Sequence, residues 1–201
     1  MTESLATHGA KLADVEPILD FGCGCGRVMR QLCAAHGELK IYGTDINAEQ
    51  IAWSRKNLPF SGLGVNGPTP PLSFSDGMFG LTYAFSVFTH LPEVLQRPWL
   101  QELARVTRPR GYLLLSLHGE ACVHERFPLT DQERFRRGEL VVRNPELANT
   151  SVQYARCGAY HPPTYVREQL AHGLEILAHR PGRVTDPVRH VATQDVWLFR
   201  T

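Results

Sequence analysis

Residues 18–30, ILDFGCGCGRVMR, constrain the fold most, because Gly22, Gly24 and Gly26 follow directly after a short apolar run. Glycine adopts backbone conformations that other residues avoid, and it lets a ligand reach the backbone without meeting a Cβ. An apolar run bounded by Pro17 and Gly22 suits a buried strand of a parallel sheet. The segment therefore predicts a strand, a glycine loop and a helix, with backbone N–H groups at the loop open to a ligand.

Cysteines alternate with these glycines, at Cys23 and Cys25. Zinc ribbons and redox motifs place two residues between paired cysteines, whereas this pair is separated by one residue. The remaining cysteines, Cys33, Cys122 and Cys157, form no second pair, and an odd total argues against a disulfide framework. We therefore expect neither a metal site nor a redox pair at the loop.

Strand and helix patterns alternate along most of the chain. They predict strands at residues 16–21, 39–45, 62–65, 79–88 and 112–118, and helices at residues 27–37, 47–58 and 97–107. Asn47 is the expected N-cap of the second helix, and Pro98 is expected in the first turn of the third. Two further apolar runs, at residues 173–182 and 193–201, predict an antiparallel pair. The fold class is α/β, a Rossmann-like doubly wound sheet, mostly parallel with an antiparallel C-terminal strand.

Composition excludes several classes of partner. The chain has 201 residues, 43% of them hydrophobic, which suits a single domain with one core. Its 21 basic residues are matched by 20 acidic ones, which disfavours a nucleic acid or an anionic membrane as partner. No apolar run approaches the roughly 20 residues needed to span a bilayer, and the first residues lack a signal-type segment. We expect a cytoplasmic protein.

Polar residues gather where the predicted strands end. Parallel strands place their carboxyl ends at one edge of the sheet, where such folds bind ligands. This edge should carry Gly22, Asp45, Asn66, Ser86 and His118. A dense glycine loop followed by an acid at the end of the second strand indicates a nucleotide-type cofactor.

Four stretches together resemble the class I S-adenosylmethionine-dependent methyltransferases: LDFGCGCG, YGTDIN, FSVFTHLPE and LQELARVTRPRGYLLLSLHG, over about residues 17–119. The resemblance implies S-adenosylmethionine as methyl donor, a small-molecule acceptor, and one domain over residues 1–201 with an inserted substrate-side segment at about 120–161. It implies that Asp45 holds the ribose hydroxyls and that Asn66 accepts from the adenine amino group. The implied cofactor-binding residues are Asp20, Gly22, Gly24, Gly26, Asp45, Ile46, Asn66, Gly67, Ser86 and Val87.

The chain also departs from the family pattern. Gly80 stands where an acid usually opens the fourth strand, which puts local stability in doubt, and Arg110 stands where a glycine is usual. A nicotinamide dehydrogenase is the alternative within the fold, but its fingerprint requires glycine where Arg27 stands. A non-catalytic binding subunit is a third hypothesis; Gly80 favours it, whereas the glycine loop and Asp45 oppose it.

Three histidines are candidates for a catalytic base, although each could instead line a wall of the site. They are His90 after the fourth strand, His118 at the end of the fifth, and His161 before a helix expected near Pro162. The inserted segment carries a predicted capping box from Thr130 to Glu133. It is also rich in arginine, at Arg126, Arg134, Arg136, Arg137, Arg143 and Arg156. An anionic acceptor would explain the arginines, and so would a composition of 18 Arg and 3 Lys.

Overall fold

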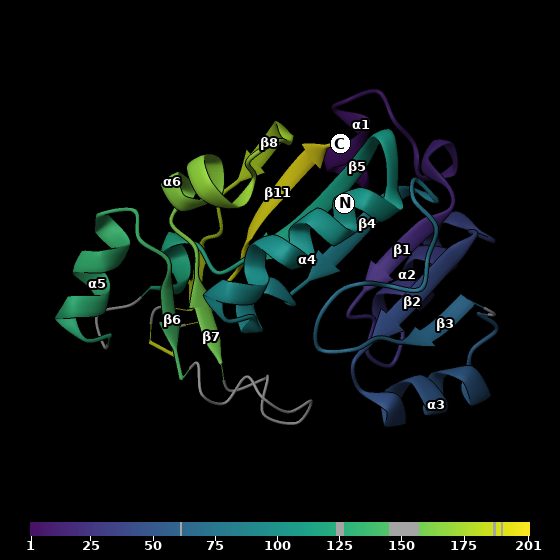
Figure 1. Ribbon diagram of the computed structural model, residues 1–201, viewed down its shortest axis with the longest axis horizontal. Helices are drawn as coiled ribbons and strands as arrows, with labels where there is room; N and C mark the ends of the chain where they lie inside the picture. The colour runs from purple at the N-terminus through teal and green to yellow at the C-terminus, as the bar shows by residue number, and fades with distance from the viewer. Residues whose placement is uncertain (61, 124–126, 145–156, 187, 190) are drawn as a thin grey trace.

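The computed structural model describes residues 1–60, 62–123, 127–144, 157–186, 188–189 and 191–201 (Figure 1). Its centre is a seven-stranded sheet in the order β3-β2-β1-β4-β5-β11-β8. The strands are β1 (Ile18–Phe21), β2 (Ile41–Asp45), β3 (Gly62–Val65), β4 (Phe79–Phe85), β5 (Thr107–Leu117), β8 (Glu175–Arg180) and β11 (Asp195–Arg200). Strands from β3 to β5 pair in parallel, and β11 pairs antiparallel to both β5 and β8. The predicted fold class is confirmed.

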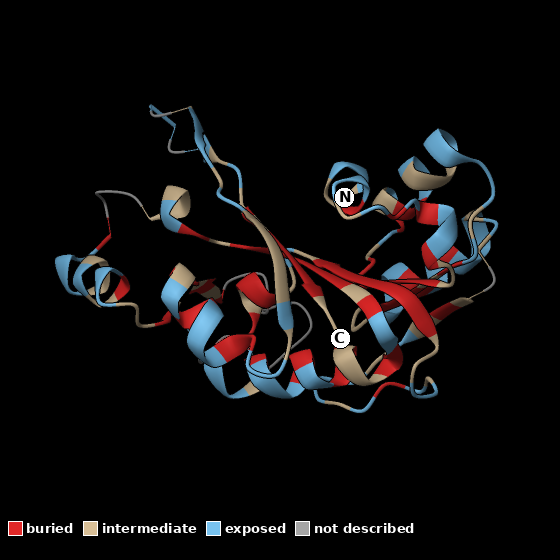
Figure 2. Cartoon of the chain, turned by 90° about the horizontal axis from the view of Figure 1, so that it is seen from above, coloured by how far each residue is buried: buried red, intermediate tan, exposed pale blue. Residues whose placement is uncertain are grey.

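Helices cover both faces of this sheet (Figure 2). The described helices are α1 (Thr2–Ala6), α2 (Arg27–His36), α3 (Ala48–Asn57), α4 (Glu93–Val106), α5 (Leu129–Arg136) and α6 (Pro163–Tyr165), with 3-10 turns at Leu12–Val15, Phe88–His90 and Glu120–Cys122 and a π turn at Val166–Leu170. Trp99 of α4 and Trp197 of β11 lie in the core of one face, and Met29 of α2 and Ile51 of α3 in that of the other. None of the described helices has the length and apolar character needed to cross a bilayer.

Two short antiparallel pairs complete the described fold. They are β6 (Val141–Arg143) with β7 (Gly158–Tyr160), and β9 (Val184–Asp186) with β10 (Val191–Ala192). A bridge between His118 and Tyr160 places β7 beside the end of β5. Figure 1 shows α5, β6 and β7 together at the end of the molecule away from β3. The substrate-side segment predicted from the sequence therefore adjoins the carboxyl edge of the sheet.

Helix starts differ from two of the predictions. Asn47 caps α3 as expected, accepting hydrogen bonds from two backbone N–H groups. Helix α4 begins at Glu93, so the prediction of Pro98 in its first turn is wrong, and the proline lies inside the helix. The capping box at Thr130 is also wrong, because α5 begins directly after Pro128 and Thr130 is already helical. In both cases the helix starts immediately after a proline, whose restricted backbone suits a first turn.

The two unusual family positions have local explanations. A Cβ on Gly80 would overlap the carbonyl of Val15, so the side chain is excluded by the turn at Leu12–Val15. Arg110 has φ 61°, in the left-handed region that glycine adopts without strain. The backbone of Arg110 also donates to the carbonyl of Thr201, at 2.9 Å. Both departures therefore concern packing away from the ligand edge.

Candidate functional site

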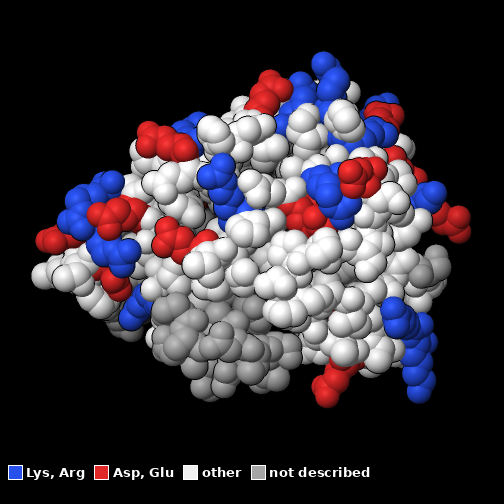
Figure 3. Space-filling view, in the orientation of Figure 1, with Lys and Arg blue, Asp and Glu red and all other residues white. Residues whose placement is uncertain are grey.

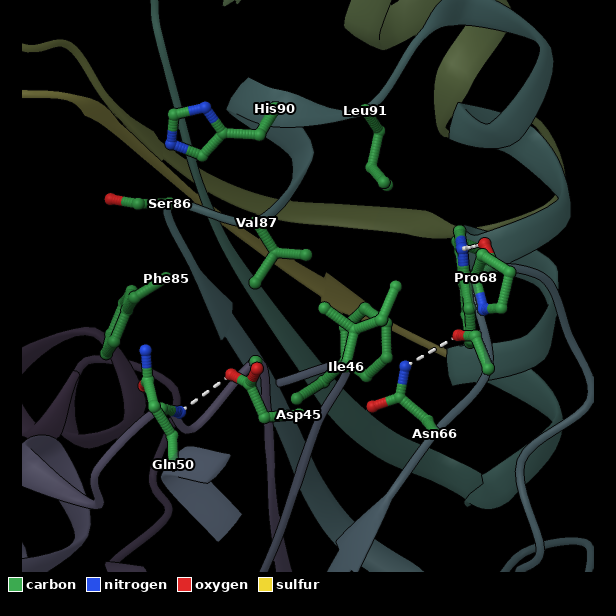
Figure 4. Close-up of a pocket in the computed structure, with 15 residues that line it drawn as sticks. Asp45, Ile46, Gln50, Asn66, Pro68, Phe85, Ser86, Val87, His90 and Leu91 are labelled. Atoms are coloured by element: carbon green, nitrogen blue, oxygen red, sulfur yellow. Dashed lines mark hydrogen bonds between the residues drawn. The ribbon is translucent and has the colours of Figure 1, made fainter. Parts of the chain in front are cut away.

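A cleft of about 340 Å³ lies at the carboxyl edge, where β1, β2 and β4 end. Figure 4 shows Asn66 at one end of it and Ser86 with His90 at the other. Its lining residues are Phe21, Gly22, Gly24, Asp45, Ile46, Gln50, Asn66, Gly67, Pro68, Phe85, Ser86, Val87, His90, Leu91 and Trp99. Eight of the ten residues that the resemblance implied for the cofactor line this cleft; Asp20 and Gly26 do not.

The glycine loop needs its glycines. Gly22, Gly24 and Gly26 have φ values of 79°, 54° and 71°, which other residues rarely adopt. A Cβ on Gly22 would overlap Val87, and one on Gly24 would lie 2.8 Å from Oε1 of Gln50. The loop therefore runs close against the opposite wall, with backbone rather than side chains facing the cleft. Gly26 serves the next element, since it precedes α2 as its N-cap.

Asp45 joins the loop to the cleft. Its Oδ2 accepts from the backbone N–H of Gly24 and its Oδ1 from that of Asn47, both at 2.8 Å. A carboxylate has about four lone-pair positions, so both oxygens retain capacity for a ligand. Asp45 is the one carboxylate among the lining residues. This fixed negative charge suits a pair of ribose hydroxyls.

The far end of the cleft holds an amide oxygen that has no hydrogen-bond partner among the described residues. Nδ2 of Asn66 donates to the carbonyl of Gly67 at 2.8 Å, which orients the amide, and its buried Oδ1 has no partner among the described residues. Beside it, Trp99 donates from Nε1 to the carbonyl of Pro68 at 3.2 Å and packs on Phe21 with ring centroids 4.6 Å apart. An acceptor above an apolar floor suits the amino edge of an adenine ring.

Asp20 lies behind the loop rather than in the cleft. It is 3% exposed, and its Oδ2 accepts from the hydroxyl of Tyr83 at 2.8 Å. Burial raises the pKa of this carboxyl to about 7, the charge of Asp45 adds to the rise, and the Tyr83 hydrogen bond opposes it. Asp20 thus links β1 to the neighbouring strand β4.

Two of the candidate histidines approach the open end of the cleft. His90 lines it, with Nδ1 2.9 Å from the carbonyl oxygen of Cys157. The ring of His118 lies 6.4 Å from that of His90 and stacks on Tyr160 at 5.0 Å between centroids. Burial lowers the pKa of His118 to about 4, with a further contribution from His90, and its buried Nδ1 has no partner among the described residues. His118 is therefore neutral at physiological pH.

The third histidine has a different position. His161 is 1% exposed and does not line the cleft. Its Nε2 lies 3.1 Å from Oε1 of Gln96, whose Nε2 donates to the carbonyls of Phe88 and Leu91 at 2.9 and 2.8 Å. The amide oxygen must therefore accept, and His161 carries its proton on Nε2. Burial lowers the pKa of His161 to about 3, so this buried ring is uncharged too.

Sequence reasoning missed six lining residues. They are Phe21, Gln50, Pro68, Phe85, Leu91 and Trp99. Gln50 carried a usable signal, because it lies in the first turn of the helix capped by Asn47, beside the expected ligand. Trp99 carried none, since only the packing of α4 brings it under the cleft.

Three of the four described arginines of the inserted segment lie beside acids, whereas Arg136 donates to the amide oxygen of Gln132 at 2.9 Å. Arg134 and Arg137 both bind Glu139, at 3.0 and 2.8 Å, and Arg143 lies 3.6 Å from Asp131. In Figure 3 basic and acidic side chains adjoin one another at the α5 end of the molecule. Arg126 and Arg156 lie outside the described residues. Within the described ranges, no three His, Cys, Asp or Glu side chains gather as ligands for a metal ion.

Comparison of the sequence with known protein families shows which family the residues around this cleft resemble. The methyltransferase-domain family matches residues 19–115. Residues 19–115 form a methyltransferase domain. Every residue that lines the cleft lies in this methyltransferase domain. The family match supports the predicted methyltransferase over the nicotinamide dehydrogenase.

Individual relatives share this domain over part of their length. The ribosomal protein L11 methyltransferase of Geobacter metallireducens is 31% identical over 135 residues, which cover 64% of this chain and 43% of that protein. A 24-methylenesterol C-methyltransferase of Oryza sativa subsp. japonica is 30% identical over 120 residues, which cover 54% of this chain and 32% of that protein. The chain thus spans less than half the length of these relatives.

Solved structures resemble nearly the whole chain. A SAM-dependent methyltransferase from Methanosarcina mazei aligns with a TM-score of 0.64 and 22% identity, covering 98% of this chain and 96% of that one. At this level of identity the likeness shows the fold. The methyltransferase domain and the strands that follow it, up to β11, therefore belong to one Rossmann-like arrangement.

Proposed function

We propose that this protein transfers the methyl group of S-adenosylmethionine to a small-molecule acceptor by in-line displacement. The observation that carries the proposal is one cleft that combines the glycine loop, the Asp45 carboxylate and the Asn66 oxygen, which has no partner among the described residues. Their order along the cleft matches the order of groups in the donor. Adenine would lie at Asn66, the ribose hydroxyls at Asp45, and the amino acid end at Gly22 and Gly24.

This placement directs the methyl group toward Ser86 and His90. The sulfonium supplies a reactive methyl group, so the protein has to align the acceptor and to accept any proton that is lost. We assign that proton to His90, the histidine that lines the cleft, with His118 beside it. A neutral His118 of low pKa is a weak base but a good hydrogen-bond acceptor for an uncharged substrate.

We assign His161 a positioning role. Through Gln96 it fixes the carbonyls of Phe88 and Leu91, which flank His90. The pairing of three of the four described arginines with acids supports an uncharged rather than an anionic acceptor. The near-zero net charge supports an acceptor other than nucleic acid, and on the same grounds of composition we place the protein in the cytoplasm.

The test is to incubate the protein with methyl-labelled S-adenosylmethionine and a cell extract separated into small-molecule, protein and nucleic-acid fractions. We expect protein-dependent label in the small-molecule fraction, and mass spectrometry of the product identifies the methylated atom. A variant with Gly24→Val serves as the control, since it should fold but lose the donor. Label confined to the protein or nucleic-acid fraction contradicts the proposed acceptor class.

A further inference from the structure

Gln194, in the turn before β11, reaches the methyl end of the cleft from far along the chain. Its Oε1 lies 3.1 Å from the hydroxyl of Ser86 and 2.6 Å from the hydroxyl of Ser116, and both hydroxyls donate to it. Ser116 in turn accepts from the backbone N–H of Ser86 at 2.9 Å. Ser86 is the one of these three that lines the cleft.

These contacts decide what Ser86 offers to a ligand. A serine hydroxyl has one proton and two lone pairs, and Ser86 gives its proton to Gln194. The Ser86 oxygen therefore keeps its lone pairs to accept a hydrogen bond from a ligand. Its backbone is held at φ 58°, a left-handed conformation that the hydrogen bond to Ser116 stabilises.

The turn that carries Gln194 is itself anchored. The neighbouring Asp195 is 3% exposed, and its carboxylate accepts from the backbone N–H of Gly182 at 2.8 Å and lies 2.7 Å from Nε2 of His179. On the other side, the backbone of Thr193 donates to the carbonyl of Arg183 at 2.9 Å. The amide of Gln194 is thus in place before a ligand arrives, which reduces the entropy lost on binding.

We propose that Gln194 is a positioning residue for the methyl donor: by taking the Ser86 proton, it makes Ser86 accept a hydrogen bond from the ammonium group of the donor. The inference rests on the proposed function. Asn66 faces the adenine amino group and Asp45 the ribose hydroxyls, so the ammonium is the remaining N–H donor of the ligand. It lies at the amino acid end, close to the sulfur, where Ser86 lines the cleft.

The test measures binding of S-adenosylhomocysteine, the demethylated donor, to the full chain by calorimetry. Gln194→Leu frees the Ser86 hydroxyl to rotate and should weaken binding about three- to tenfold, the usual effect of one hydrogen bond. Gln194→Glu keeps acceptor oxygens for both serine hydroxyls. Its dissociation constant for S-adenosylhomocysteine should be no more than about twofold higher than that of the wild type.

A double-mutant cycle separates positioning from a purely structural role. If Gln194 acts through Ser86, then Gln194→Leu should change the dissociation constant less than about twofold in a Ser86→Ala background. Unfolding temperatures report any structural loss, which should be smaller in the Ser86→Ala background because the bond between Ser86 and Gln194 is already absent there. An unchanged dissociation constant for Gln194→Leu, or equal weakening with and without Ser86, overturns the proposal. A wild-type chain that does not bind the probe overturns the proposed function and this inference with it.

Discussion

Asp45 serves the protein and its ligand with the same two oxygens. It fastens Gly24 and Asn47 through their backbone N–H groups and faces the cleft. We expect Asp45→Ala to weaken donor binding by about 1.5–3 kcal/mol for each charge-assisted hydrogen bond lost. Calorimetry with S-adenosylmethionine measures this loss. Glu49→Ala, an exposed acid in the first turn of α3, is the matched control; equal affinities of the two variants would show that the assignment of Asp45 is wrong.

The buried Asp20 makes the stability of the fold depend on pH. Its pKa is about 7 in the folded protein and about 3.9 in an unfolded chain, so the folded state binds more protons between these values. The contribution of Asp20 to the free energy of unfolding therefore falls as pH rises from about 4 to about 7 and stays constant above pH 7. His118 and His161, with lowered pKa values, act in the opposite direction as pH rises through about 3 to 6.5.

Asp20→Asn isolates the contribution of Asp20. Its amide oxygen can still accept from Tyr83, but the cost of burying a charge is gone. The variant should therefore gain about 2–3 kcal/mol on the wild type between pH 5 and pH 8, measured by urea unfolding at both values. Glu49→Gln, at an exposed site, should show no such change. If the variant and the wild type differed in free energy of unfolding by the same amount at pH 5 and pH 8, the charge of Asp20 would not be the cause of the difference.

Substitution of His90 tests whether this residue accepts a proton from the acceptor. If His90 accepts a proton, His90→Ala should lower turnover about 10²–10⁴-fold while donor affinity stays nearly constant. Rates are measured with labelled donor and a saturating small-molecule extract. His36→Ala, at the exposed end of α2, is the control. If His90→Ala instead raised the acceptor concentration needed for half-maximal rate and left turnover unchanged, His90 would line the site without acting as a base.

Among the elements, α4 holds two segments of the cleft, and a third segment next to it, from one face. Gln96 binds the carbonyls on either side of His90, Trp99 binds the carbonyl of Pro68, and Glu102 accepts from the backbone of Leu72 at 2.7 Å. Residues three positions apart share a face of a helix, so one rigid element positions both ends of the site. Arg105 extends this row by donating to the carbonyl of Phe74 at 3.0 Å.

Gln96→Leu tests this arrangement. It removes the partner of three buried polar groups, two carbonyls and the ring of His161, at about 1–3 kcal/mol for each group left unsatisfied. We expect a clear loss of the free energy of unfolding in urea, together with weaker donor binding. Gln101→Leu on the exposed side of the same helix should change neither. Similar stabilities of the two variants would mean that Gln96 does not hold the turn.

The features that could be predicted from the sequence are those formed by residues close together along the chain. The glycine loop, the cap at Asn47 and the acid at Asp45 lie within one strand-loop-helix pattern or directly after it, and the mostly parallel sheet follows from the repetition of that pattern. The contacts of His161 with Gln96 and of Ser86 with Gln194 join residues 65 and 108 positions apart. No periodicity encodes such pairs, because they arise only when the elements pack.

For the molecule as a whole, β11 joins the parallel part of the sheet to β8. Trp197 lies on this strand fully buried, with its ring stacked on His179 at 3.8 Å and Arg167 5.1 Å from its centroid. We expect Trp197→Ala to lower the free energy of unfolding by about 3–5 kcal/mol. Trp53→Ala, at a site 48% exposed, should cost far less under the same denaturant titration. If both variants lost the same free energy of unfolding, Trp197 would contribute no more to the stability of the core than an exposed tryptophan does.

The position of β11 also sets an order of events during synthesis. Strand β8 pairs with β11 and emerges from the ribosome before it, at about 5–20 residues per second. Until β11 follows, the far side of β5 and the whole of β8 present unpaired backbone, which is an opportunity for mispairing with other chains. The glycine loop and its acid are by then long complete. A nascent chain therefore carries its ligand-binding half well before the sheet that steadies it can close, and an early ligand or a chaperone would act in that interval.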